Sequence, residues 1–240
     1  GELIALPSIS VEPFEASLAI SSNGERLGVL GREQCRIVSG TQVQRFQRIP
    51  NPITVIEITQ TFLAIAGEDF SIQLFDNQMK SSRALSMLGS YTAIDIDHKN
   101  GSLLAATEEM IDVWELSVFP KNVLQLKGLK QSGSPMLANI SKSHVVVLYE
   151  RGDLLVLDYE TNARSNTTLS LEHAISKAAF NQDATLLAFI SGGTPFGYDL
   201  RTNQLAALQW MPEEPVGVQF DEQDRIILWT KDGVFYRSTK

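Results

Sequence analysis

Apolar and polar residues alternate in short runs along the whole chain. A clear example is Ile72–Asp76, which follows the acidic turn residues Glu68 and Asp69 and ends at Asp76. A period of two puts one set of side chains on a buried face, which is typical of a short β-strand. Runs with similar ends stop at residues 39, 76, 115, 158, 199 and 237, at spacings of 37, 39, 43, 41 and 38 residues. A period near 40 residues indicates a structural repeat.

Two further apolar runs precede each of these ends. One closes on a large apolar residue before a polar turn, as Ile96 does, and the next is short and apolar throughout, as in Leu186–Ile190. Such a run predicts a strand that is enclosed on both faces. A weaker run opens each unit, and its examples are Leu3–Leu6, Val43–Phe46, Ala84–Leu88, Val123–Leu126, Thr168–Leu171 and Leu205–Leu208. We therefore predict that each unit starts on its innermost strand and ends on its outermost strand.

The pattern predicts an all-β protein made of four-stranded antiparallel units. One such unit leaves its apolar faces uncovered, whereas stacking the units around an axis buries them and leaves only short edges. We expect a single β-propeller domain over residues 1–240 with about six blades. The predicted blades are residues 1–39, 40–76, 77–115, 116–158, 159–199 and 200–240. The alternative is a ring of seven blades, of which one lies outside this sequence.

The repeat ends resemble those of the WD-repeat β-propellers. Asp112–Glu115 stands where that family has its Trp-Asp strand end, and Asp76, Asp158 and Asp199 stand at the same place in other units. His173–Asp183 is similar to the family's second strand with its polar turn. The resemblance covers nearly the whole chain. It implies a rigid ring whose loops bind other proteins without catalysing a reaction.

Composition and charge narrow the classes of function. The 240 residues are 43% hydrophobic, and runs such as Val145–Tyr149 are far shorter than the roughly 20 apolar residues that cross a bilayer. The net charge of −8 argues against a nucleic-acid partner and against an anionic membrane surface. Cys35 is the single cysteine, which excludes an intrachain disulfide and a cysteine-based zinc site. We expect a cytoplasmic protein without membrane insertion, with the nucleus as the other intracellular location.

Several carboxylates are candidates for chemistry. The pair Asp69 and Asp76 is interpreted as structural, because Asp often bonds its own backbone in turns and equivalents of Asp76 recur in most units. Asp95, Asp97 and His98 form the best metal candidate, since Asp95 and Asp97 share one face of a strand. The position of Asp95 in the repeat is occupied elsewhere by Glu57, Asn139, Ala179 and Gln219. A polar or small residue repeated at this position favours hydrogen bonding between units over metal binding.

No catalytic motif stands out in the sequence. The three histidines, His98, His144 and His173, fall in different units, and no pattern indicates that a nucleophile and an acid converge on any of them. Neither a P-loop nor a GxGxxG motif is present. We therefore expect a protein that is not an enzyme and that requires no cofactor or metal.

The expected function is a protein-interaction scaffold, with one or more proteins as partners. Loops on one face of the ring would bind the partner, because loops on a rigid frame commonly carry binding residues. The candidate partner-binding residues are Met79, Lys80, Arg83, Phe119, Lys121 and Tyr159. For Phe119 and Tyr159 the alternative is that the ring folds back onto the edge of its own blade. Two other functions remain open: a six-bladed enzyme or small-ligand binder with a metal in its central channel, and one propeller domain of a larger chain.

Overall fold

The structure is a computed structural model of the chain, and every element that it describes is a β-strand. It describes residues 17–20, 26–30, 34–39, 42–47, 53–59, 62–67, 72–76, 82–85, 90–97, 99–117, 120–129, 131–142, 144–208, 214–221, 223–233 and 235–237. Within these ranges no helix is long and apolar enough to cross a membrane. The predicted all-β class is therefore confirmed for the described part of the chain.

The strands form antiparallel sheets in which each strand pairs with its neighbours in sequence. Five sheets have four strands, in the orders β1–β4, β5–β8, β9–β12, β13–β16 and β17–β20, and β21–β23 form a three-stranded sheet. The strands of the first three sheets are β1 (Ser17–Ile20), β2 (Arg26–Leu30), β3 (Gln34–Ser39), β4 (Gln42–Gln47), β5 (Ile53–Ile58), β6 (Phe62–Gly67), β7 (Ile72–Asp76), β8 (Ser82–Ala84), β9 (Ala93–Asp97), β10 (Ser102–Ala106), β11 (Met110–Glu115) and β12 (Lys121–Lys127). The strands of the last three are β13 (Pro135–Ser141), β14 (His144–Tyr149), β15 (Asp153–Asp158), β16 (Ala163–Thr168), β17 (Ile175–Phe180), β18 (Leu186–Ser191), β19 (Thr194–Asp199), β20 (Gln204–Ala207), β21 (Gly217–Phe220), β22 (Ile226–Trp229) and β23 (Phe235–Arg237).

Each sheet starts one strand later than the sequence pattern predicted. The run Val43–Phe46, predicted to open a unit, lies in β4 and pairs with β3 as the fourth strand of the preceding sheet. The predicted unit ends at residues 39, 76, 115, 158 and 199 therefore fall between the third and fourth strands of a sheet. The reason is the length of the connections. A short turn joins β15 to β16 and lets them pair as a hairpin, whereas a longer segment links β16 to β17. The predicted strand Leu3–Leu6 lies outside the described residues.

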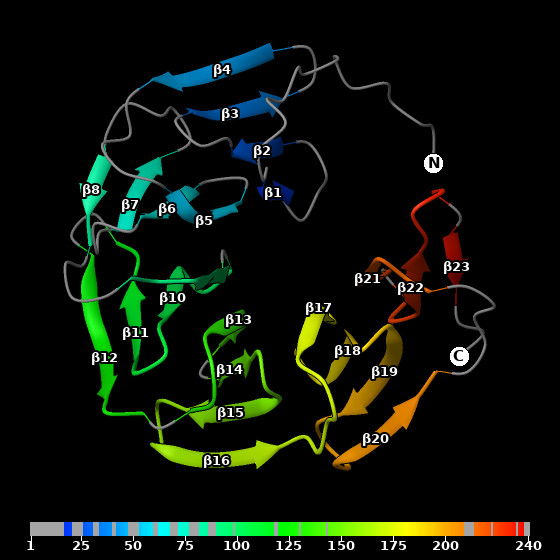
Figure 1. Ribbon diagram of the computed structural model, residues 1–240. Helices are drawn as coiled ribbons and strands as arrows, with labels where there is room; N and C mark the ends of the chain where they lie inside the picture. Colours follow the sequence, from blue (N-terminus) through cyan, green and yellow to red (C-terminus); the bar gives the residue numbers. More distant parts are fainter. Residues whose placement is uncertain are drawn as a thin grey trace. The chain divides into compact units, whose positions relative to one another are not determined.

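The chain divides into two compact units, Gly1–Gln125 (unit 1) and Leu126–Lys240 (unit 2). In unit 1, β5 contacts β1, β2 and β9, and in unit 2, β17 contacts β13 and β21. Within each unit the first strands of neighbouring sheets thus lie side by side (Figure 1). The fourth strands form outer edges, and in unit 2 the residues of β16 and β20 are almost all exposed.

The second strands β6, β10, β14 and β18 supply much of the core. All residues of β10 are buried, and five of the six residues of both β6 and β18 are buried. The prediction that Leu186–Ile190 is enclosed on both faces is thus confirmed, except at the half-buried Leu186. In unit 1 the core also includes Tyr91 and Trp114, whose rings meet edge to face at 6.3 Å between centroids. Burial of apolar surface between sheets is the main force that holds each unit together.

Candidate functional site

The structure describes three of the six predicted partner-binding residues. Met79, Lys80 and Phe119 lie outside the described residues. Arg83 lies on β8, opposite Leu74 of β7. Lys121 is exposed at the first residue of β12, and Tyr159 is half-buried in the turn after β15.

The turns that carry these residues share an edge with the turns between first and second strands. In an antiparallel sheet of four sequential strands, the first and third turns lie at the same edge and the second lies at the opposite one. We use the name turn edge for the end of the strands at which the first and third turns of a sheet lie. In the β13–β16 sheet it includes Lys142 and Tyr159–Asn162, and in the β17–β20 sheet it includes Gln182–Thr185 and Leu200–Asn203.

Tyr159 connects the two turns of its own sheet. Its hydroxyl donates a hydrogen bond to the carbonyl oxygen of Lys142, which lies in the turn between β13 and β14. The ring is therefore folded back on the sheet edge instead of projecting toward a partner. Lys142 itself is exposed and adopts a positive φ of 52°. Tyr159 thus acts first as a brace that positions the neighbouring turn.

Aspartates at the ends of third strands hold the turns of unit 2 in one conformation. Asp158 Oδ1 accepts hydrogen bonds from the amides of Glu160 and Thr161, at 3.0 and 2.9 Å. The Thr161 amide bond is the main reason why the pKa of Asp158 lies below its usual value. The turn closes at Asn162 with a φ of 58°, a left-handed conformation that Asn tolerates better than most residues.

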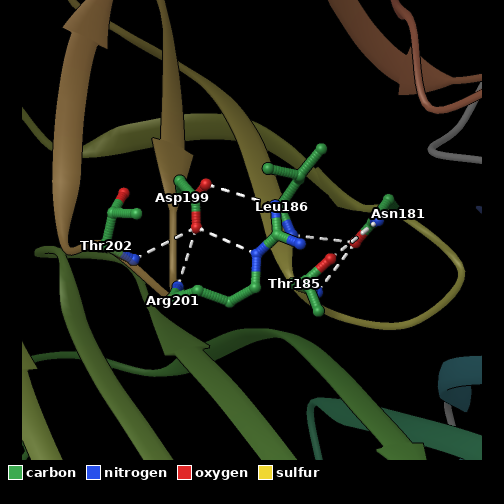
Figure 2. A network of polar contacts seen from close by, with 6 residues as sticks. All are labelled: Asn181, Thr185, Leu186, Asp199, Arg201 and Thr202. Atoms are coloured by element: carbon green, nitrogen blue, oxygen red, sulfur yellow. Dashed lines mark hydrogen bonds and ion pairs between the residues drawn. The ribbon is translucent and has the colours of Figure 1, made fainter.

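The turn after β19 repeats this design (Figure 2). Asp199 Oδ1 accepts from the amides of Arg201 and Thr202, at 2.8 and 3.2 Å, and Asn203 has a φ of 56°. The Arg201 guanidinium lies 3.3 Å from Asp199 Oδ2. Its hydrogen bond, followed by that of the Arg201 amide, lowers the pKa of Asp199. The structural interpretation of strand-end aspartates is therefore confirmed for Asp158 and Asp199; the side chain of Asp76 and all of Asp69 lie outside what is described.

The other turn of this sheet is held by Asn181. Its Oδ1 accepts from the amides of Thr185 and Leu186, both at 2.8 Å, and its Nδ2 donates to Thr185 Oγ1 at 3.1 Å. Figure 2 shows the Asn181 contacts beside the Asp199 contacts at the turn edge. Ala184, at the centre of the turn, is buried with a φ of 51°. Both turns therefore present fixed backbone and side-chain positions.

A pocket of about 370 Å³ opens in unit 2 between the β13–β16 sheet and the β17–β20 sheet. One wall is a row of residues that lie opposite one another on four strands: Asn139, Val146, Val156 and Ser165. The facing wall includes Tyr198 and Leu200 of the other sheet. The side chains in the row are short, so the two sheets do not fill the space between them near the turn edge. The pocket lies within the size range of small-ligand sites.

Charged and titratable side chains also line the pocket, among them His144, Arg201 and the exposed Asp183. His144 Nε2 lies 3.8 Å from Asp158 Oδ2, and the Arg201 guanidinium is paired with Asp199. Among the lining residues, the Tyr198 hydroxyl donates to Oδ1 of Asn203, an exposed residue of the turn after β19, at 2.9 Å. By contrast, Asn139 Oδ1 is buried in the wall and accepts no hydrogen bond.

The predicted metal candidate has a different role in the structure. Asp97 caps its own turn, accepting from the amides of Lys99 and Asn100 at 3.0 and 3.2 Å and from Asn100 Nδ2 at 2.6 Å. Asp95 on β9 lies near Glu57 on β5 in the neighbouring sheet of unit 1. Burial, and then the charge of Asp95, raise the pKa of Glu57 well above its usual value. His98 is not described, and the described residues include no group of three or more His, Cys, Asp and Glu side chains that could hold a metal ion.

Two buried carboxylates were missed by sequence reasoning. Asp112 is fully buried on β11 and accepts from Tyr91 Oη, Asn122 Nδ2 and Gln125 Nε2, at 2.6, 3.0 and 2.8 Å. Asp153 at the start of β15 accepts from the Ser132 amide and from Thr168 Oγ1, at 2.6 and 2.7 Å. A lone charge within the apolar run of β11 is a signal that could have revealed Asp112, because a buried carboxylate requires partners.

The histidines do not form a described catalytic arrangement. His144 and His173 are both exposed; His144 is the first residue of β14, and His173 lies in the segment between β16 and β17. The Ser191 hydroxyl donates to the main-chain carbonyl of His173 at 2.6 Å and not to its imidazole. Cys35 lies on β3 opposite Leu30 and Phe46.

No protein-family model matches the chain, and no curated protein matches its sequence. The resemblance to WD-repeat proteins therefore depends on the repeat residues alone.

Proposed function

We propose that this chain is a non-catalytic platform for a partner protein, built as a WD-repeat-like β-propeller in which each of the six sheets is one blade. The partner binds on the turn edge. Support for the propeller comes from the repeated four-stranded sheets and from the side-by-side packing of their first strands within each unit.

The observation that carries the proposal is the repeated locking of exposed turns at one edge. Asp158 and Asp199 hold two turns in the same conformation, Asn181 holds a third, and Tyr159 braces a fourth. Binding loses less conformational entropy when the contacting turns are ordered beforehand. A series of preformed turns on one edge therefore suits recognition of another protein.

A matched pair of substitutions tests the binding edge. Lys142 lies in the turn between β13 and β14 on the turn edge, and Arg151 lies in the turn between β14 and β15 on the opposite edge. Both side chains are exposed, so Lys142→Glu and Arg151→Glu make the same change of charge without disturbing the core. Lys121→Glu extends the test to unit 1.

The measurement is quantitative affinity capture from native extract, with the full chain and each variant as bait. The expected result is a stoichiometric partner that Arg151→Glu retains and that Lys142→Glu or Lys121→Glu weakens. The triple variant Lys80→Glu, Phe119→Ala, Lys121→Glu tests the residues predicted from sequence in the same assay. A partner held equally by all variants would place the binding surface elsewhere, and a stoichiometric partner lost only with Arg151→Glu would reverse the assignment of the edge.

A further inference from the structure

The pocket of unit 2 has the chemistry of a binding site. Val146, Leu154, Val156 and Leu200 provide apolar walls, and the ring of Tyr198 adds aromatic surface. These side chains favour a ligand group that is itself mainly apolar, because its burial removes apolar surface from water. The pocket opens at the turn edge, where the proposed partner binds.

The charges around the pocket disfavour an anionic ligand. Arg201 is paired with Asp199, and the exposed Asp183 adds a carboxylate to the lining. A charged ligand would lose its hydration on entering these apolar walls and would gain little in return. Phosphate-bearing and carboxylate-bearing ligands are therefore disfavoured.

One polar atom in the wall of the pocket lacks a hydrogen-bond partner. Asn139 Oδ1 is buried without a hydrogen-bond donor, and an unpaired buried acceptor destabilises the fold because it has lost its bonds to water. The terminal torsion of Asn is broad, so the amide can rotate and present its oxygen to the cavity. A ligand with one N–H donor would satisfy this atom.

We propose that the pocket receives a tryptophan side chain of the partner protein, whose indole N–H donates to Asn139 Oδ1 while its rings lie between the Val156 wall and Tyr198. This proposal rests on the proposed function. Among the protein side chains, Trp combines a large apolar surface with a group that only donates. The phenol of Tyr would bring an additional acceptor into the apolar pocket, and Lys or Arg would bring a charge and several donors.

The test uses the full chain labelled with ¹⁵N and a blocked amino acid, N-acetyl-L-tryptophanamide, titrated by NMR. The expected dissociation constant is on the order of 1 mM, as for a ligand of this size held by one pocket. The amide signals of Val146, Val156 and Leu200 should shift, because these residues line the pocket. N-acetyl-L-leucinamide, which is apolar but has no side-chain donor, should bind at least about tenfold more weakly.

Two variants separate the pocket from non-specific binding. Val156→Phe fills the pocket and should abolish the shifts, whereas Val123→Phe places the same residue on exposed β12 and should leave them unchanged. Shifts that survive Val156→Phe would overturn the proposal. The absence of shifts at saturating ligand in the native chain would overturn it as well.

The role of Asn139 is tested with the 1-methyl analogue, which lacks the indole N–H. The native chain should prefer the parent compound by about tenfold, and Asn139→Leu should bind both compounds equally. Asn139→Leu should also keep or raise the melting temperature, since it removes an unpaired buried oxygen. If Asn139→Leu still preferred the parent compound, steric fit would explain the preference and the hydrogen bond would be refuted. A chain that fails to bind the blocked tryptophan but loses its partner with Lys142→Glu keeps the proposed function and refutes only this inference.

Discussion

The two units differ in the residue at one recurring position of the first strand of a sheet. In unit 1 the half-buried carboxylates Glu57 on β5 and Asp95 on β9 occupy it and lie near each other. Unit 2 has Asn139, an uncharged amide, at the corresponding position of β13. Each unit also has one buried aspartate, Asp112 or Asp153, besides aspartates that cap turns. The charge at this position thus differs between the two units, and this difference contributes to how the stability of each unit depends on pH.

Glu57 and Asp153 make the stability of the folded state depend on pH with opposite signs. The pKa of Glu57 is raised in the folded state, so its contribution to stability is present below the unfolded value near 4.5 and is lost as the pH rises. Burial opposes the shift of Asp153, but hydrogen bonds from Thr168 and Ser132 lower its pKa below 3.8. The contribution of Asp153 is therefore present above that value and is lost as the pH falls. Neutral pH disfavours the Glu57 site in unit 1 and favours the Asp153 site in unit 2.

The largest effect is expected from Asp112→Ala. Removing this carboxylate leaves Tyr91, Asn122 and Gln125 without their acceptor and opens a cavity beneath β12. The free energy of unfolding should fall by about 3 kcal/mol. Hydrogen–deuterium exchange should show faster exchange in β9–β12, while urea unfolding measures the total change. An unchanged exchange rate in this sheet would show that the buried network does not stabilise it.

A smaller loss of stability is expected when Asn139 of unit 2 is replaced by an acid, the residue type at the corresponding position in unit 1. Asn139→Asp places a carboxylate among the apolar walls of the pocket, and burial should raise its pKa as it does for Glu57. Stability at pH 7 should fall by about 2 kcal/mol and should recover as the pH is lowered toward 4. Urea unfolding at a series of pH values measures this directly. A loss that is independent of pH would indicate a packing effect and not the burial of charge.

The reverse change in unit 1 should stabilise the protein. Glu57→Gln removes the charge that burial and Asp95 disfavour, and it should add on the order of 1 kcal/mol at pH 7. The gain should disappear near pH 4, where Glu57 is protonated in the native chain. The matched control is Glu115→Gln, at the exposed last residue of β11, and it should change the stability little. A gain that persists at pH 4 would contradict the assignment of the raised pKa to Glu57.

The smallest effect is expected at the turn edge. Asp199→Asn keeps an oxygen for the amides of Arg201 and Thr202 but loses the ion pair with Arg201. Because Arg201 is exposed and Asp199 is only half-buried, the melting temperature should fall only slightly at pH 7, and the difference from the native chain should shrink as the pH falls below 3.8. The same substitution at Asp112 provides the contrast, and it should have a much larger effect. Equal losses of stability at the two positions would show that a buried carboxylate and a turn-edge carboxylate contribute alike.

Much of the local structure could be predicted from the sequence. The period of two located the strands, the spacing near 40 residues indicated the repeat, and the strand-end position of Asp158 and Asp199 indicated a turn. These features depend on interactions within a few residues, such as the alternation of faces along a strand and the bonding of an aspartate to the next amides. They are therefore readable without knowledge of the fold.

The pairing of strands, the braced Tyr159, the Asp112 network and the pocket were decided by tertiary structure. A weak run such as Val43–Phe46 has a neighbour on each side in sequence, and pattern alone does not say which one it joins. In the structure it joins β3. The partners of Asp112 come from β12 and from the segment before β9, and the pocket arises where short side chains of one sheet face a turn of another. Such features depend on which distant surfaces meet, and the alternation of residues along one strand does not contain that information.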